Sequence, residues 1–145
     1  MYRNVLVAYD GTDGARAALG QAVDIVGPSG GALTLAWSVP EKSALDPVEL
    51  RPADPEAASK ARHALDEVIS SLDAGLGASP WVVAGPADDA VLAVARDIEA
   101  DLVVTGSRGR GRLARALLGS VSSQLVAKAH CDVLVVHPGE QSAND

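Results

Sequence analysis

One segment of the chain combines glycine, serine and arginine in a pattern suited to binding phosphate. Residues 106–112 read Gly-Ser-Arg-Gly-Arg-Gly-Arg, and Gly119-Ser120 follows after a short interval. Glycines let the backbone approach a ligand and turn its N–H groups toward an anion. A helix is expected to begin at Gly119-Ser120, and the free N–H groups and dipole of a helix N-terminus also favour an anion. We therefore predict a phosphate site here, in which Ser120 caps the helix, binds a phosphate oxygen, or does both.

The charge around this segment differs in sign from that of the rest of the chain. Residues 102–131 contain no Asp or Glu, and their basic side chains give them a formal charge of +5. The whole chain of 145 residues carries -7, which leaves -12 on the other 115 residues. An acidic protein of this kind is neither a typical nucleic-acid binder nor suited to an anionic membrane surface. One basic, glycine-rich segment can still hold a small phosphorylated ligand.

Other kinds of site receive less support from the residues. The glycine segment is not a Walker A loop, because Ser120 and not lysine follows Gly119, and it does not follow the first strand as a dinucleotide-binding fingerprint should. His130 and Cys131 are adjacent, which is poor geometry for two metal ligands, and there is no second cysteine. We therefore predict neither a protein-built metal site nor a catalytic residue. The simpler alternative to a phosphate site is a solvated turn with an ordinary helix cap.

The expected elements alternate between strand and helix, which is typical of a parallel sheet covered on both faces. Buried strands are expected at residues 4–9, 32–39, 81–85, 101–105 and 132–137, and amphipathic helices at 15–26, 57–72, 86–100 and 119–129. Gly27-Pro28 is expected to end the first helix. In such a sheet, ligands bind at the carboxyl ends of strands where the strand order reverses. Asp10 and Gly106 each follow or end a strand and are candidate site residues.

These elements predict a single-domain α/β fold, an open five-stranded parallel sheet with helices on both faces. We expect the domain to cover residues 1–138, with a polar tail at 139–145 and one long connection at 40–55. No apolar run exceeds about six residues, far below the roughly 20 that span a bilayer. The single cysteine, Cys131, excludes an internal disulfide and favours a reducing compartment. No signal peptide is recognisable, so we expect a cytoplasmic protein without membrane contact.

Several stretches of the chain resemble the universal stress protein family. The spacing Gly106-x2-Gly109-x9-Gly119-Ser120 is similar to the ATP-binding motif of that family. Residues 5–12 resemble its first strand and acidic turn, residues 100–109 its fourth strand and loop, residues 117–122 its phosphate segment, and residues 131–136 its last strand. The resemblance covers residues 3–138. One departure is Asp132, where many members have proline, but this position lies outside the nucleotide motif.

The resemblance implies a nucleotide site and a role for each of its residues. The strand order of the family, 3-2-1-4-5, would bring Asp10 beside Gly106, and ATP with Mg²⁺ is the implied ligand. Asp10 would hold ribose hydroxyls or lie near the metal, Gly106 would flank the ribose, and Ala8 and Val39 would border the adenine. The phosphates would bind the backbone N–H groups of Gly109, Gly119, Ser120 and Val121, with Ser122 nearby. From its charge, we expect Arg108 to screen the outer phosphates.

The resemblance also implies a homodimer formed through the last strand, from Val133 to Val136, which would otherwise be an exposed apolar edge. It favours a nucleotide-responsive regulator of the stress response rather than an enzyme with turnover, acting through a protein partner that the sequence does not identify. Three alternatives stay open. They are a slow ATPase or phosphotransferase using the same pocket, a sensor of AMP or cyclic AMP, and a partner-binding module that binds no nucleotide.

Overall fold

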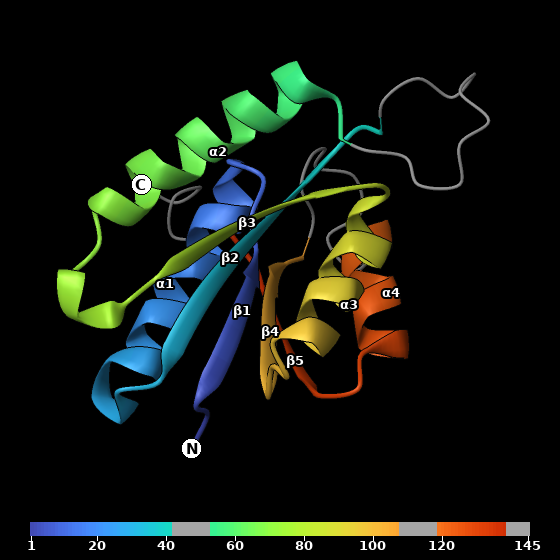
Figure 1. The fold of residues 1–145 in the computed structure, drawn as a ribbon. Helices are drawn as coiled ribbons and strands as arrows, with labels where there is room; N and C mark the ends of the chain where they lie inside the picture. Colours follow the sequence, from blue (N-terminus) through green and yellow to red (C-terminus); the bar gives the residue numbers. More distant parts are fainter. Residues whose placement is uncertain (42–52, 108–118, 139–145) are drawn as a thin grey trace.

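The computed structural model describes residues 1–41, 53–107 and 119–138. This part of the chain forms an open sheet of five parallel strands in the order β3-β2-β1-β4-β5 (Figure 1). The strands are β1 (Asn4–Ala8), β2 (Ala32–Val39), β3 (Ser79–Ala84), β4 (Leu102–Gly106) and β5 (Asp132–Val136). The helices are α1 (Asp13–Ser29), α2 (Pro55–Ser70), the 3₁₀ turn η1 (Ala74–Leu76), α3 (Ala87–Asp97) and α4 (Ser120–Lys128). The predicted fold class and strand order are confirmed.

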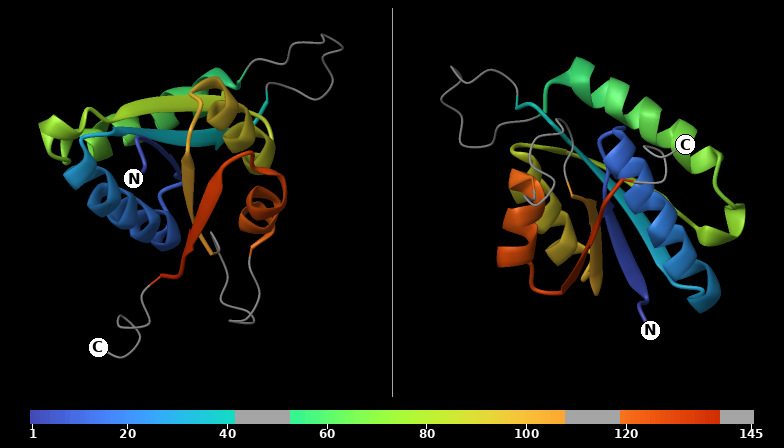
Figure 2. Two further views of the ribbon diagram at one scale, coloured as in Figure 1. Left: turned by 90° about the horizontal axis from the view of Figure 1, so that it is seen from below. Right: turned by 180° about the vertical axis from the view of Figure 1, so that it is seen from behind.

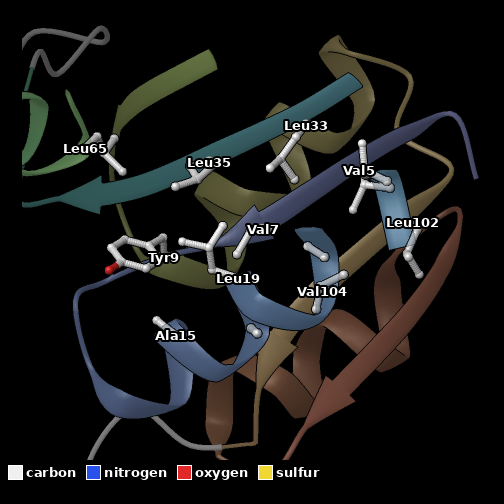
Figure 3. Packing of buried hydrophobic residues seen from close by; sticks show 13 residues of the cluster. Val5, Val7, Tyr9, Ala15, Leu19, Leu33, Leu35, Leu65, Leu102 and Val104 are labelled. Carbon is white, nitrogen blue, oxygen red and sulfur yellow. The ribbon is translucent and has the colours of Figure 1, made fainter. Parts of the chain in front are cut away.

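The helices cover both faces of the sheet, with α1 and α2 packed on one face and α3 and α4 on the other (Figure 2). The central strand β1 contributes side chains to the hydrophobic clusters on both faces of the sheet. Its Val5 and Val7 pack on the α1 face beside Leu19 of α1 and Leu35 of β2 (Figure 3), whereas Leu6 packs on the α3 face. All three β1 side chains are fully buried. Burial on both faces explains why residues 5–8 of this strand form an unbroken apolar run.

The first helix is longer than the sequence predicts. α1 passes through Gly27 and Pro28 to Ser29, so the prediction that Gly27-Pro28 ends the helix is wrong. Pro28 lies in the last turn, where its missing N–H removes only one helical hydrogen bond. The helix ends at Gly30, whose positive φ of 68° lets its N–H donate to the carbonyl of Val26 at 3.1 Å.

The long connection predicted at 40–55 lies largely outside the described residues, but its two ends meet. Glu41 and Ala53 form an isolated antiparallel bridge. α2 begins earlier than predicted, at Pro55, because Asp54 caps it by accepting the N–H of Ala57 at 3.0 Å. The predicted tail at 139–145 also lies outside the described residues. None of the helices in the described ranges has the length and apolar character needed to cross a membrane.

The strand order reverses at β1, whose two neighbours are β2 and β4. Val7 of β1 pairs with Val104 of β4, so the residues that follow β1 lie beside the end of β4. Gly106 ends β4 so close to α1 that a Cβ atom there would lie 2.8 Å from the backbone of Gly14. Only glycine fits at this approach. The start of α1 and the end of β4 therefore meet at the carboxyl edge of the sheet.

Candidate functional site

A cavity of about 240 Å³ lies at this carboxyl edge, bordered by the ends of β1, β2 and β4 and by the starts of α1, α3 and α4. Seven of the predicted site residues line it: Ala8, Asp10, Gly106, Gly119, Ser120, Val121 and Ser122. The structure thus brings together the acidic turn after β1 and the glycine-serine start of α4. Two further predicted residues, Arg108 and Gly109, lie outside the described residues.

On β2 the cavity wall is formed by other residues than the one predicted. Val39 is buried but is not among the described lining residues, and its carbonyl accepts the N–H of Gly85 at 3.0 Å. Ala36 and Ser38 line the wall instead, two positions apart on the same face of the strand. Side chains of a strand alternate between its two faces, so Ser38 shares a face with Ala36, and this alternation is the sequence signal that could have found Ser38.

Sequence reasoning missed eight lining residues: Tyr9, Thr12, Ala15, Ala36, Ser38, Ala87, Val91 and Thr105. Six of the eight are alanine, serine or threonine, whose small side chains leave space beside the backbone. For Thr12 a signal exists, because threonine just before a helical segment is a typical N-cap. For the alanines no local pattern separates a residue that lines a cavity from one that packs in the core.

The turn after β1 holds the exposed Asp10 in a defined orientation. Its carboxylate oxygen Oδ1 accepts the backbone N–H of Thr12 at 3.0 Å and the hydroxyl of Thr12 at 2.5 Å. Thr12 is also the N-cap of α1, since its Oγ1 accepts the N–H of Ala15 at 3.3 Å. Gly11, between them, has a φ of 80°, which glycine adopts without strain. Oδ2 of Asp10 has no partner among the described residues and is available to a ligand.

The start of α4 presents unused N–H groups to the cavity. The N–H of Gly119, the N-cap, donates to the carbonyl of Ser107 at 2.6 Å, so the protein itself engages it. The N–H groups of Ser120, Val121 and Ser122 have no acceptor within the described ranges, as expected for the first turn of a helix. The first turn of α4 contains no acidic residue, whereas the first turns of α1, α2 and α3 each do. This helix start is therefore the one best suited to an anion.

Two buried serines connect the start of α4 to the sheet. The hydroxyl of Ser122 donates to the carbonyl of Ser107 at 3.0 Å, with the carbonyl of Gly119 also in reach at 3.1 Å. The N–H of Ser107 donates to the carbonyl of Val136, at the end of β5, at 2.8 Å. The hydroxyl of Ser122 is thus engaged within the protein. The hydroxyl of Ser120, which is exposed, has no partner among the described residues and can bind a ligand.

An aromatic pair lies behind the Asp10 turn. Tyr9 and Trp37 contact edge to face, with ring centroids 5.8 Å apart and an interplanar angle of 63°. Tyr9 is buried and lines the cavity, while Trp37 packs against Gly11 so closely that a Cβ atom at that glycine would lie 3.3 Å from its ring. The two rings support the turn from the α1 side of the sheet.

In the part of the chain that the structure describes, the two groups with clearly shifted pKa values lie at the other end of the sheet. The hydroxyl of Tyr2 donates to the carboxylate of Asp132 at 2.6 Å, and this hydrogen bond raises the pKa of Tyr2. Partial burial, followed by the negative charges of Asp132 and Asp101, raises the pKa of the Cys131 thiol. A raised pKa disfavours the thiolate, which is the reactive form of cysteine.

The chain is similar to known proteins over nearly its whole length. Residues 1–137 match the family model described as the universal stress protein family. A putative universal stress protein of Staphylococcus epidermidis is 30% identical over 146 residues, covering 96% of this chain and 86% of the relative.

Solved structures agree with this sequence match. A universal stress protein of Lactobacillus plantarum superposes with a TM-score of 0.76 at 26% identity, covering 93% of this chain and 97% of that one. A universal stress protein determined in complex with cAMP superposes with a TM-score of 0.69 at 25% identity, covering 95% and 99%. The residues that match the family model, 1–137, include every residue that lines the cavity. The chain therefore belongs to the universal stress protein family.

Proposed function

We propose that the cavity binds an adenine nucleotide, with ATP as the expected ligand, and that the protein is a nucleotide-responsive regulator of a stress response. The observation that carries the proposal is the start of α4. Three backbone N–H groups without a described acceptor border the cavity there, and no acidic residue of that first turn opposes an anion. A phosphate group is the natural ligand for such a helix N-terminus.

The remaining lining residues suit the other parts of a nucleotide. The phosphates bind the N–H groups of Ser120, Val121 and Ser122 and the hydroxyl of Ser120, and Arg108 and Gly109 add to this from the glycine segment. The ribose lies near Asp10 and Gly106. The base lies against the small apolar side chains that line the cavity from β1, β2 and α3, which are Ala8, Ala36 and Val91. Val39 stays a proposed neighbour of the adenine.

Magnesium fits this arrangement as a companion of the nucleotide. Nucleotide-bound Mg²⁺ is held by phosphate oxygens with one or two carboxylates and water. Among the described residues that line the cavity, Asp10 supplies one carboxylate, and its Oδ2 is without a described partner. When bound, the metal would neutralise part of the phosphate charge. The same oxygen can instead accept a ribose hydroxyl, so the two roles of Asp10 are alternatives for one atom.

A sensor of AMP or cyclic AMP is the second candidate function. It is supported by the relative that was determined in complex with cAMP, at 25% identity over nearly the whole of both chains. Competition of ATP against AMP and cyclic AMP, measured by calorimetry, separates the two candidates by the order of affinity. Release of phosphate over many turnovers would instead support the remaining alternative, a slow ATPase.

The proposal is tested by adding an acidic residue to the start of α4. Ser120→Asp places a carboxylate among the free N–H groups, where it satisfies the helix and repels phosphate. We expect unchanged or higher thermal stability and a loss of ATP affinity of at least tenfold, measured by calorimetry with Mg²⁺. Ser59→Asp makes the same change at an exposed serine of α2 that does not line the cavity, and should bind ATP like the wild type. Equal ATP affinity of both variants would contradict the site, and no ATP binding by the wild type would contradict the function.

We also propose that the protein is cytoplasmic and that two copies of the chain form a homodimer by pairing their β5 strands. β5 pairs with β4 on one side, and within the described residues no strand pairs with its other edge. Its residues Val133 to Val136 are only half-buried, so pairing with a second copy would cover apolar surface. Light scattering at micromolar concentration should give the mass of a dimer, and Leu134→Lys should shift it toward the mass of a monomer.

A further inference from the structure

Thr12 caps α1 and also donates two hydrogen bonds to the carboxylate of Asp10. We infer that Thr12 is a positioning residue that fixes the carboxylate of Asp10, and that this contact makes the site select ribonucleotides over deoxyribonucleotides. The inference rests on the proposed nucleotide site and adds to it a determinant of sugar selectivity.

The hydrogen bonds of Thr12 determine where its hydroxyl proton goes. A threonine hydroxyl carries one proton and two lone pairs. One lone pair of Thr12 accepts the N–H of Ala15, at 3.3 Å, so the proton is free to be donated to Oδ1 of Asp10, at 2.5 Å. The backbone N–H of Thr12 donates to the same oxygen at 3.0 Å. Two donors from one residue thus hold one carboxylate oxygen before any ligand binds.

The rest of the turn keeps this arrangement in place. Gly11 has a φ of 80°, and the ring of Trp37 packs against it, which leaves little space for the turn to shift. Trp37 in turn contacts the buried Tyr9. The turn is therefore preorganised, and binding a ligand through Oδ2 of Asp10 needs no further ordering of the carboxylate.

The chemistry of Oδ2 defines the ligand group that it can accept. A carboxylate accepts hydrogen bonds but cannot donate them, so it requires a donor. A nucleotide offers sugar hydroxyls and the amino group of its base, while its phosphates are anions that a carboxylate repels. Asp10 is exposed, whereas the apolar residues suited to the base, Ala36 and Val91, are buried. The donor that meets Asp10 is therefore a sugar hydroxyl, and a nucleotide that lacks it loses a hydrogen bond to a charged group.

The test compares affinities for ATP, 2′-deoxy-ATP and 3′-deoxy-ATP, measured by calorimetry with the full chain. The wild type should prefer ATP over at least one deoxy analogue by roughly tenfold or more, the value expected for a hydrogen bond to a charged group. Thr12→Val keeps the shape of the side chain but removes its hydroxyl, and should reduce this preference by at least about threefold. Thr12→Ser restores the hydroxyl and should restore the preference.

A matched variant separates positioning from capping. Asp54→Ala removes the N-cap of α2, which lies outside the cavity wall, just as Thr12→Val removes the N-cap of α1. Both variants should melt at a lower temperature, but only Thr12→Val should change the ratio of the affinities for ATP and deoxy-ATP. An unchanged ratio in Thr12→Val overturns the role of Thr12 while the proposed function stands. Absence of binding of every nucleotide by the wild type overturns the proposed function and this inference with it.

Discussion

The two ends of the sheet use their hydrogen-bonding groups in opposite ways. At the amino end, the carboxylate of Asp101 accepts the backbone N–H groups of Arg3 and Asn4 at 2.8 and 3.0 Å. The side-chain amide of Asn4 donates to the carbonyl of Ile98. At the carboxyl end, the first N–H groups of α4 and one oxygen of Asp10 have no partner among the described residues.

Because of this difference, we expect the residues at the amino end to determine stability and the unpartnered groups at the carboxyl end to determine ligand binding. At the amino end, both partners of each contact belong to the protein, so removal of one leaves the other without its bond. At the carboxyl end, a ligand must supply the partner of these groups, so removal of one of them should change affinity more than stability. The comparison predicts that loss of a contact at the amino end leaves ATP affinity unchanged, and that loss of an unpartnered group at the carboxyl end leaves stability unchanged.

The largest effect is expected where both properties depend on one residue. A valine at Gly106 would place its Cβ atom 2.8 Å from the backbone of Gly14 and change the cavity wall as well. We expect Gly106→Val to lower the free energy of unfolding by about 2 kcal/mol or more and to abolish ATP binding. Urea unfolding and calorimetry measure the two effects. Gly20→Ala is the matched control, because a Cβ atom there meets nothing within 4 Å, and it should be neutral or stabilising.

The amino end alone is tested by Asp101→Ala. This change leaves the N–H groups of Arg3 and Asn4 without their acceptor and should lower the free energy of unfolding by about 1–3 kcal/mol. ATP affinity should not change. Asp97→Ala removes the same charge from an exposed position of α3 and should leave stability nearly unchanged. A loss of ATP affinity in correctly folded Asp101→Ala would show that the two ends are not independent.

The carboxyl end alone is tested by Ser120→Ala. The hydroxyl of Ser120 has no partner among the described residues, so the free energy of unfolding should change by less than about 0.5 kcal/mol. ATP affinity should fall by roughly fivefold, which corresponds to one lost hydrogen bond to phosphate. Ser123→Ala, at an exposed position of the same helix outside the cavity wall, should bind ATP as the wild type does. The prediction fails if stability falls and affinity does not.

The smallest effect concerns Tyr2 at high pH. Its pKa is raised in the folded protein by the hydrogen bond to Asp132, so the folded state favours the neutral phenol. The stabilising contribution is therefore complete below the ordinary tyrosine pKa of about 10 and is lost as pH rises through the folded-state value. Wild type should lose more stability than Tyr2→Phe between about pH 9 and pH 11, measured by urea unfolding at both pH values. Parallel losses would contradict the contribution of Tyr2.

Local patterns were sufficient to predict the strands but not every boundary. The apolar run of β2 predicted both of its ends, Ala32 and Val39. The end of α1 was missed because the chain continues a helix through Pro28 when only one hydrogen bond is lost. The contacts at the amino end could not be predicted, since they join residues 94 to 130 positions apart in the sequence. The strand order came from the family resemblance and not from periodicity.

The candidate site was predicted where its residues follow strands or begin a helix. Asp10, Gly106 and Ser120 occupy such positions, and all three line the cavity. Thr12 was missed as a site residue because its two bonds to Asp10 depend on the turn at Gly11, which residue types alone do not specify. On β2, Ser38 lines the wall where Val39 was expected, a difference of one position that changes the face of the strand.

The aromatic pair behind the Asp10 turn gives the protein a built-in optical reporter. The chain contains two tryptophans, Trp37 and Trp81. Trp37 contacts Tyr9, which lines the cavity, whereas Trp81 lies on the edge strand β3, is 36% exposed and is outside the cavity wall. Occupation of the cavity should therefore alter the emission of Trp37 while Trp81 acts as an internal reference. With Trp81→Phe, the emission of a single indole follows the occupancy of the cavity without any added label.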